Sequence, residues 1–132
     1  SYINSPASLG PGLTASGNDR LFFAGQITGV EGYTESLGTG ILAGINLARR
    51  LEGLPVAVPP PTTMLGGLYR YLREADPSHF QPMNANFGLL EPLAGKLKKD
   101  RKKELLVERA QAEFRTWMDA VGINAVTQGS RV

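Results

Sequence analysis

The chain has 132 residues, which is enough for one domain and hardly for two. With 42% apolar and 20% charged residues, its composition is that of a folded globular protein. The absence of cysteine excludes a disulfide framework, a thiolate metal site and a cysteine nucleophile within these residues. The single histidine, His79, argues against a histidine-rich metal site or a serine-histidine-acid triad, so we predict no metal site and a structural histidine.

No apolar stretch approaches the ~18 residues of a membrane span, so we expect a cytoplasmic protein without membrane contact. Because the chain opens with Ser1, we expect it to be a piece of something longer. The net charge of +2 is unevenly distributed. Residues 1–95 carry five basic and seven acidic side chains, whereas residues 96–132 carry nine and five. Such a basic end is found at nucleic-acid contacts, although a solvated helix face is the commoner cause.

The first third of the chain predicts a loop, a strand and a glycine-rich turn. Residues 1–20 are rich in Ser, Pro, Gly and Asn, which is typical of loops. The apolar run Leu21–Gly25 predicts a central strand buried on both faces and parallel to its neighbours. Glycines at 25, 29 and 32 then allow positive φ or close approach, as in a loop built around a ligand or a tight packing contact.

A helix is predicted from Thr34, a candidate N-cap, to Gly53. Its apolar stripe consists of residues at helical spacing, namely Leu37, Ile41, Ile45 and Ala48. The same helix contains several glycines, each costing ~1 kcal/mol relative to alanine in a helix interior, which predicts a very close neighbour.

The second half of the chain begins with four prolines in residues 55–61, which predict a stiff extended connector and a boundary between segments 1–54 and 55–132. A helix capped by Thr62 should end before Asp76-Pro77, and residues 78–95 form an ordered loop. The last helix is predicted from Asp100 to Ala120, and the polar tail 122–132 is expected to fray. Its apolar face contains Leu106, Ala110, Phe114, Trp117 and Val121.

Two glycine patterns were candidates for a phosphate or cofactor site. Gly38-Thr39-Gly40-Ile41-Leu42-Ala43 matches the G-x-G-x-x-A dinucleotide fingerprint, but it lies inside a helix and not at a strand-to-helix turn, so we reject it. The segment 25–36 is the stronger candidate, because free N–H groups at a helix start stabilise negative charge. The ligand bound at this segment could be a phosphate, or it could be a flavin, whose pyrimidine end gains negative charge on reduction. An ordinary strand-to-helix turn fits these residues equally well.

Several stretches together resemble one family, the FAD- and folate-dependent tRNA uridine-5-methyltransferases, in their C-terminal part. The stretches span most of residues 1–118 and are Tyr2-Ile3-Asn4-Ser5-Pro6, the run from Leu21 to Tyr33 with Glu35-Ser36, Gly44-Ile45-Asn46, and the run from Phe80 to Leu89. Where the family more often has a sequence of the Ala-Ala-Ser-Gly kind, this chain has Leu37-Gly38-Thr39-Gly40.

The resemblance implies the α/β class: the C-terminal part of a Rossmann-like FAD-binding fold, mostly helical in this segment with one central strand. Residues 1–54 would end the FAD-binding domain, and residues 55–132 would form a helical segment with a basic last helix. The implied enzyme takes the methylene group of methylenetetrahydrofolate, places it on C5 of the T-loop uridine of tRNA and reduces it with reduced FAD. The resemblance also associates it with NAD(P)H. This chain lacks the family's phosphate loop and catalytic cysteines, so no catalytic residue is assigned, and it should need the remainder of its parent polypeptide.

The resemblance also implies three groups of site residues. Flavin-binding residues would be Gly25 and Gln26 beside the sugar-alcohol chain, and Gly32, Tyr33, Thr34 and Glu35 beside the ring. The folate or uridine pocket would include Asn84, Asn86 and Phe87, since amides can read a heterocycle's edge while a ring stacks on its face. The tRNA would meet Lys98, Lys99, Arg101, Lys102 and Lys103 through its phosphates. Two alternatives remain open. Tyr33 could be a buried aromatic residue with a hydrogen-bonded hydroxyl, and the stretch with Asn84, Asn86 and Phe87 could be a plain ordered loop.

Two other functions stay open. A related FAD enzyme that modifies the wobble uridine of tRNA shares the glycine-glutamine loop but is expected to carry a larger C-terminal extension. A small RNA-binding module would use the last helix alone, and would leave the glycine loop and the small-residue helix unexplained.

Overall fold

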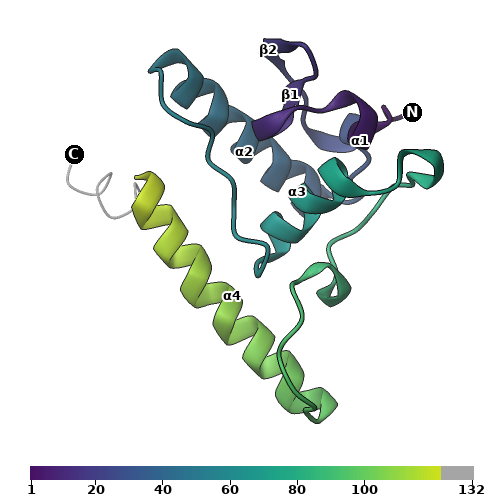
Figure 1. Ribbon diagram of the computed structural model, residues 1–132, viewed down its shortest axis with the longest axis vertical. Coiled ribbons are helices and arrows are strands. Elements are labelled where there is room, and N and C mark those ends of the chain that lie inside the picture. Colours follow the sequence, from purple (N-terminus) through teal and green to yellow (C-terminus); the bar gives the residue numbers. More distant parts are fainter. Residues whose placement is uncertain (123–132) are drawn as a thin grey trace.

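The computed structural model describes residues 1–122, so the predicted tail 122–132 lies outside the described residues from residue 123 on. The chain is mostly helical, as predicted. Three helices dominate, namely α2 (Tyr33–Leu51), α3 (Met64–Glu74) and α4 (Lys99–Val121), and a short helix α1 covers Ser5–Ser8. Short 3-10 turns occur at Pro11–Leu13 (η1), Gly25–Thr28 (η2), Pro77–His79 (η3) and Phe87–Leu89 (η4). Helices α2 and α3 lie together with the N-terminal elements, and α4 runs along one side of them (Figure 1).

The prediction of one central parallel strand at Leu21–Gly25 is wrong. The strands are β1 (Thr14–Ala15) and β2 (Asn18–Phe22), which pair antiparallel as a hairpin. Gly17 adopts a φ of +80° in the turn between them, so the chain folds back at once. Most of β2 is exposed, so it is not a strand buried on both faces. Of the apolar run that suggested such a strand, Phe22 and Phe23 are partly buried and pack against the core. The loop predicted for residues 1–20 is likewise replaced by α1, η1 and this hairpin.

The predicted helix ends agree with the structure to within about two residues. Helix α2 starts at Tyr33 with Gly32 as N-cap, so the prediction of Thr34 as N-cap is wrong. The chain turns after α2 at Gly53, whose φ is +72°. The N-cap of α3 is Thr63 and not Thr62, because the Thr63 hydroxyl accepts the Gly66 N–H at 3.0 Å. Helix α4 starts one residue before Asp100 and ends at a left-handed Gly122. Residues 55–60 belong to neither helix nor strand, and this proline connector runs as a coil between α2 and α3 (Figure 1).

One hydrophobic core joins residues from both sides of the proline connector. Asn46 of α2 fixes the connector, because its Oδ1 accepts the Ala57 N–H at 2.6 Å and its Nδ2 donates to the Ala57 carbonyl at 3.1 Å. The division at residue 54/55 remains a prediction. The buried apolar side chains of this core are Leu9, Leu13, Val30, Leu42, Ala43, Leu68, Tyr69, Leu72 and Phe80.

The predicted apolar stripe of α2 is not its buried face. Leu37 and Ile41 are 65% and 53% exposed. The side chains that α2 buries are instead Thr39, Leu42, Ala43 and Asn46. Apolar residues occupy two sides of this helix, and periodicity alone does not say which side meets the core of this chain. The hydrogen bonds of Thr39 and Asn46 hold the second side inward.

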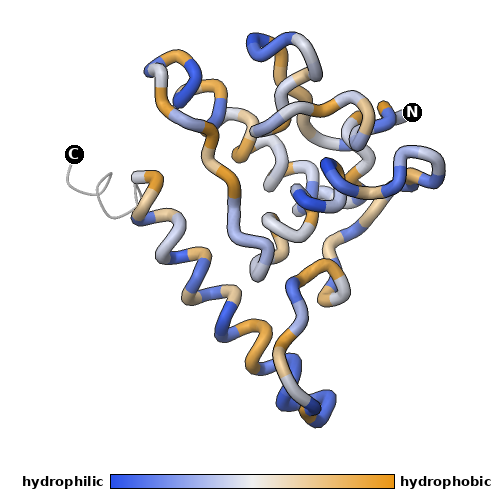
Figure 2. The backbone as a smooth tube through the Cα atoms, in the orientation of Figure 1, coloured by the Kyte–Doolittle hydropathy of each residue, from blue (hydrophilic) through white to orange (hydrophobic). Residues whose placement is uncertain are grey.

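The predicted inner face of α4 is confirmed: Leu106 is buried, and the other four members are half-buried. The Arg109 guanidinium donates to the carbonyl oxygens of Glu91 and Pro92, which fixes the loop before the helix. The first turns of α4 are strongly hydrophilic along the backbone trace (Figure 2). Among residues 1–122, no helix has the length and apolar character that crossing a membrane would require.

Candidate cofactor and substrate site

The glycine loop after the hairpin is tied to helix α2. Gly25 and Gly29 adopt φ angles of +78° and +98°, so the predicted positive φ is confirmed at both. The Gly25 N–H donates to the Thr39 hydroxyl at 2.9 Å, and the Thr28 hydroxyl donates to the Gly25 carbonyl at 2.7 Å. These bonds place the loop over the first turns of α2.

The N-terminus of α2, which we call the mouth of the helix, lies at the N-cap residue Gly32, and no side chain caps the helix there. Gly32 has a φ of +99° and a ψ of 157°, a conformation that is essentially restricted to glycine. A Cβ at this position would overlap the Glu35 carboxylate, which lies against the Gly32 backbone. The first N–H groups of a helix lack partners within it, and a negative charge is favourable beside them. Glycine at 32 therefore leaves room for the Glu35 carboxylate beside the start of the helix.

A second loop, residues 83–88, lies directly beside the glycine loop. The Glu31 N–H donates to the Met83 carbonyl at 3.0 Å, and the Met83 N–H donates to the Gly29 carbonyl at 2.8 Å. Asn84 Nδ2 donates to the Glu31 carbonyl at 3.2 Å, across 53 residues of sequence. The residues predicted to bind the flavin and those predicted to bind folate or uridine are therefore neighbours.

A cavity of about 570 Å³ lies at the glycine loop, within the usual size range of small-molecule sites. Tyr33 is 97% exposed at its rim, so the alternative of a buried aromatic with a bonded hydroxyl is wrong. Four of the six predicted flavin residues line this cavity together with Ser36, namely Gly25, Gln26, Gly32 and Tyr33.

The other two predicted flavin residues, Thr34 and Glu35, line a separate and more apolar cavity of about 260 Å³. This cavity lies between the start of α2, helix α3 and Ala85 of the second loop. Consecutive residues of a helix point in different directions, which divides the six predicted residues between two cavities.

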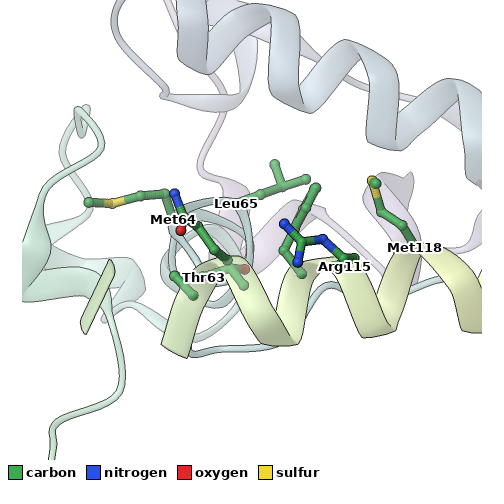
Figure 3. Close-up of a pocket in the computed structure, with 8 residues that line it drawn as sticks. Thr63, Met64, Leu65, Arg115 and Met118 are labelled. Atoms are coloured by element: carbon green, nitrogen blue, oxygen red, sulfur yellow. The ribbon is translucent and has the colours of Figure 1, made fainter. Parts of the chain in front are cut away.

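Sequence reasoning missed the α4 contribution to this region. Met64, Leu65 and Phe114 line the 260 Å³ cavity and also a further one of about 570 Å³ between the start of α3 and α4. Arg115 and Met118 line this cavity from α4, and Thr63, Met64 and Leu65 line it from the start of α3 (Figure 3). No sequence pattern indicated this cavity, because it arises where two helices distant in sequence pack together.

The three residues predicted for folate or uridine recognition have different surroundings. Asn86 caps the turn η4, since its Oδ1 accepts the Gly88 N–H at 2.9 Å and its Nδ2 donates to the Asn84 carbonyl at 3.0 Å. Asn84 and Phe87 are exposed, and Lys103 Nζ lies 5.5 Å from the centre of the Phe87 ring. Asn86 thus shapes the loop, while Asn84 and Phe87 present polar and aromatic groups.

All five basic residues predicted to contact RNA lie in or next to the first turns of α4 and are exposed. Arg101 forms an ion pair with Glu104 at 3.0 Å. The contact of Lys103 with Phe87 joins this basic turn to the second loop, as cations are attracted to ring faces at such distances. The basic turn and the amide loop therefore form one continuous surface.

His79 lies away from these cavities, in the turn after α3. Its Nδ1 is 2.9 Å from Asp76 Oδ2, and both side chains are largely exposed. The hydrogen bonds from the His79 side chain and the Ser78 N–H lower the pKa of the Asp76 carboxyl. Within residues 1–122, no three His, Asp or Glu side chains gather closely enough to hold a metal ion.

The described residues thus bring together a helix N-terminus without a side-chain cap, an adjoining loop of amides and a basic surface. Residues 1–55 match the family model described as glucose inhibited division protein A. Over 120 residues, or 91% of this chain, the sequence is 53% identical to the methylenetetrahydrofolate–tRNA-(uracil-5-)-methyltransferase TrmFO of Geobacter sulfurreducens. The proteins of the same name from Pelobacter propionicus and Thermus thermophilus are 51% and 46% identical over 121 and 120 residues, again 91% of this chain.

Over 91% of its length, the chain is similar to these methylenetetrahydrofolate–tRNA-(uracil-5-)-methyltransferases. It spans 28% of the length of the Geobacter sulfurreducens relative and 27% of the other two. The predicted family resemblance is confirmed.

Proposed function

We propose that this chain is part of an enzyme that methylates C5 of the T-loop uridine of tRNA. Methylenetetrahydrofolate would donate the carbon and reduced FAD would reduce it to a methyl group. The observation that carries the proposal is the 53% identity, over 91% of this chain, to a protein whose name gives a folate, tRNA and uracil C5 as its reactants. The wider fold would be Rossmann-like, with residues 1–54 ending the FAD-binding domain.

The flavin would occupy the cavity at the glycine loop. The free volume of about 570 Å³ lined by Gly32 and Tyr33 fits a flat heterocycle next to the start of α2. FAD, when bound, would supply the reducing electrons. Gly25 and Gln26 would lie beside its sugar-alcohol chain, where the open space next to the Gly25 α-carbon leaves room for a ligand. The N–H groups at the α2 mouth would favour the negative charge of the reduced ring.

Tyr33, Thr34 and Glu35 would have separate roles around that ring. Tyr33 lines the same cavity and is 97% exposed, so its ring is free to cover a bound heterocycle. The Glu35 carboxylate is a hydrogen-bond acceptor at the helix mouth, suited to an imide N–H. Thr34 and Glu35 also face the apolar cavity on the other side of α2.

Folate or the uridine would lie against the second loop. Asn84 is exposed, and its amide nitrogen lies 3.6 Å from the position of a Cβ on Gly32. A ligand at the mouth of α2 would therefore be within reach of the Asn84 amide. Phe87 would stack on a ring from the side of the basic turn, and Asn86 would hold Phe87 in place by capping η4.

The basic turn would bind tRNA phosphates. Lys98, Lys99, Arg101, Lys102 and Lys103 are exposed and adjoin the loop that carries Phe87. Phosphate neutralisation would supply affinity without sequence preference, and the loop would face the nucleotide that is modified.

The test uses a polypeptide of the relatives' length that contains these residues. It is incubated with tRNA lacking the T-loop modification, methylenetetrahydrofolate and reduced FAD, and the digested nucleosides are analysed by mass spectrometry. We expect 5-methyluridine to form, and its formation to require the folate. A tRNA in which the target uridine of the T-loop is replaced by cytidine is the matched control and should remain unmethylated.

Two results would favour the other functions. FAD binding with modification at the wobble uridine would favour the related wobble-uridine enzyme. Binding of tRNA with no flavin bound would favour an RNA-binding module and would overturn the assignment of the glycine loop.

A further inference from the structure

A small cavity between the proline connector and α3 carries two arginine side chains that the sites described above do not use. Its volume is about 280 Å³. Arg70 and Arg73, one turn apart on α3, line it together with Tyr69. Pro59 of the connector forms part of its wall and is fully buried, which fixes that side of the cavity. Guanidinium groups held beside a fixed wall are suited to bind an anion.

The positive charges of this cavity exceed the negative ones. The ion pairs within residues 1–122 are all formed by other basic side chains. Arg70 donates instead to the Leu89 carbonyl oxygen at 3.2 Å, and Arg73 donates to the Tyr69 hydroxyl at 3.1 Å. Both arginines are half-buried, and Glu74 is the one acidic residue that lines the cavity with them. Because a partly desolvated charge without a counter-ion is unfavourable, the surplus favours a bound anion.

The hydroxyl of Tyr69 adds an unused donor to the same cavity. Tyr69 is only 7% exposed, and its oxygen accepts two hydrogen bonds, from the Gly12 N–H at 2.9 Å and from Arg73. The described residues provide no acceptor for the hydrogen of this hydroxyl. Buried donors in folded proteins are nearly always paired, so we expect a bound group to accept this hydrogen. The phenol and the two guanidinium groups thus all require an acceptor ligand.

The cavity lies close to the basic turn of α4, because the short turn η4 connects the two. Arg70 reaches the end of η4, where it bonds to Leu89 and lines a further cavity of about 180 Å³ with Gly88 and Leu89. Lys103 of the basic turn lies 5.5 Å from the ring of Phe87, the first residue of η4. Three residues of a 3-10 helix rise by only about 6 Å, so one RNA strand can contact both places.

We propose that Arg70, Arg73 and Tyr69 form a second phosphate-binding site for the tRNA. The guanidinium groups and the Tyr69 hydroxyl donate to the oxygens of one backbone phosphate, whose charge neutralises the surplus of the cavity. Together with the basic turn, this site holds the RNA strand at both ends of η4 and fixes its direction across the second loop. The choice of tRNA as the source of the phosphate rests on the proposed function, whereas the anion site rests on the three side chains.

The first test replaces both arginines by glutamine in the polypeptide of the relatives' length. Fluorescence anisotropy measures tRNA binding at several salt concentrations, and the loss of one phosphate contact should lower the slope of log K against log salt by about 1. Arg70→Lys with Arg73→Lys keeps the charges but loses the planar forks, so we expect weaker binding with the wild-type slope. Arg20→Gln with Arg50→Gln is the matched control and should change neither. An unchanged slope in the double glutamine variant would overturn the proposal.

Arginine labelling of the unaltered polypeptide removes any dependence on folding of the variants. Phenylglyoxal modifies accessible guanidinium groups, and mass spectrometry of the digest reads each arginine separately. We expect Arg70 and Arg73 to be labelled without RNA and protected by tRNA, while Arg20 is labelled in both states. Resistance of Arg70 and Arg73 to the label without RNA would mean that another part of the polypeptide fills the cavity. Equal protection by inorganic phosphate at the same phosphate concentration would assign the site to a free anion. Either result would overturn the proposal.

These measurements and the test of the proposed reaction can fail separately, because neither binding nor labelling requires FAD or folate. Formation of 5-methyluridine together with an unchanged salt slope in the glutamine variant would remove the second phosphate site alone. Protection of Arg70 and Arg73 by tRNA without formation of 5-methyluridine would remove the proposed reaction alone.

Discussion

The glycine-loop region and helix α4 are held in place in different ways. The glycine loop, the second loop and α2 are joined by backbone bonds such as Met83 N–H to Gly29 O at 2.8 Å, and they rest on a core with fully buried Leu13 and Leu72. Helix α4 buries only Leu106 and half-buries the rest of its apolar face. Arg109 in its middle donates to the Pro92 carbonyl oxygen, and Arg49 of α2 donates to the Val121 carbonyl oxygen at its C-terminal end. The helix runs along one side of the other elements (Figure 1).

This difference matches the two kinds of ligand proposed. A flat cofactor is bound by fixed groups on a rigid frame, because misplaced groups lose most of their effect. Phosphates of an RNA are bound by charge, which tolerates small displacements. We therefore expect stability to depend on the glycine-loop region, and RNA affinity to depend on the beginning of α4.

The largest expected effect is the loss of stability from a cavity in the core. Leu72→Ala removes a fully buried side chain, and we expect a loss of about 2–5 kcal/mol in the free energy of unfolding. Val107→Ala on the exposed side of α4 is the control, with a loss within about 0.5 kcal/mol. Urea unfolding of both variants measures the difference. Equal losses would mean that α4 is as firmly packed as the core.

The next effect concerns RNA affinity. Replacing Lys98, Lys99, Lys102 and Lys103 by alanine removes up to four phosphate contacts, so the slope of log K against log salt should fall by about 3. Fluorescence anisotropy with tRNA in the relatives'-length polypeptide measures it. The matched control replaces Arg20 and Arg50, which lie on the hairpin side, and should keep the wild-type slope. An unchanged slope in the lysine variant would place the RNA elsewhere.

A smaller effect separates the two asparagines of the second loop. Asn86→Ala removes the cap of η4, and we expect it to cost about 0.5–2 kcal/mol of stability. Asn84→Ala removes one exposed hydrogen bond to Glu31 and should leave stability within about 0.5 kcal/mol, while weakening ligand binding. Thermal unfolding and folate titration of the two variants test this distinction. A reversed order of the two losses in stability would contradict it.

The smallest effect is a pH dependence at Asp76. Its lowered pKa means that the folded state favours the carboxylate, so this group stabilises the fold above the ordinary pKa of an aspartate. The contribution is lost as the pH falls through the lowered pKa. The difference in stability between wild type and Asp76→Asn should therefore be small at pH 6 and absent below both pKa values. A difference that grows as the pH falls has the wrong sign.

The sequence predicted the long helices, their ends and the neighbourhood of the site, for identifiable reasons. Gly53, Gly122 and Pro77 are strong local stop signals. The family resemblance singled out the Gly25–Glu35 and Asn84–Phe87 stretches, which lie side by side in the structure. The hairpin was not predicted, because an apolar run reads alike in a buried strand and in a strand end packed on a core.

The orientation of α2 also lay beyond the sequence. Its stripe through Leu37 and Ile41 is a genuine helical period, but a helix with two apolar sides does not reveal which one this chain buries. The same limit applied to the cavity between α3 and α4, since Met64 and Phe114 meet only through tertiary packing.

The central claim is that the open mouth of α2 at Gly32 binds the flavin. Its most direct test compares Gly32→Ala with Gly53→Ala in the relatives'-length polypeptide, because both glycines have positive φ and flank opposite ends of α2, while Gly53 has open space around it. Bound flavin is measured by absorbance after purification, with circular dichroism as the check on folding. We predict that Gly32→Ala loses the flavin and Gly53→Ala retains it. Full flavin content in a folded Gly32→Ala protein would contradict the account.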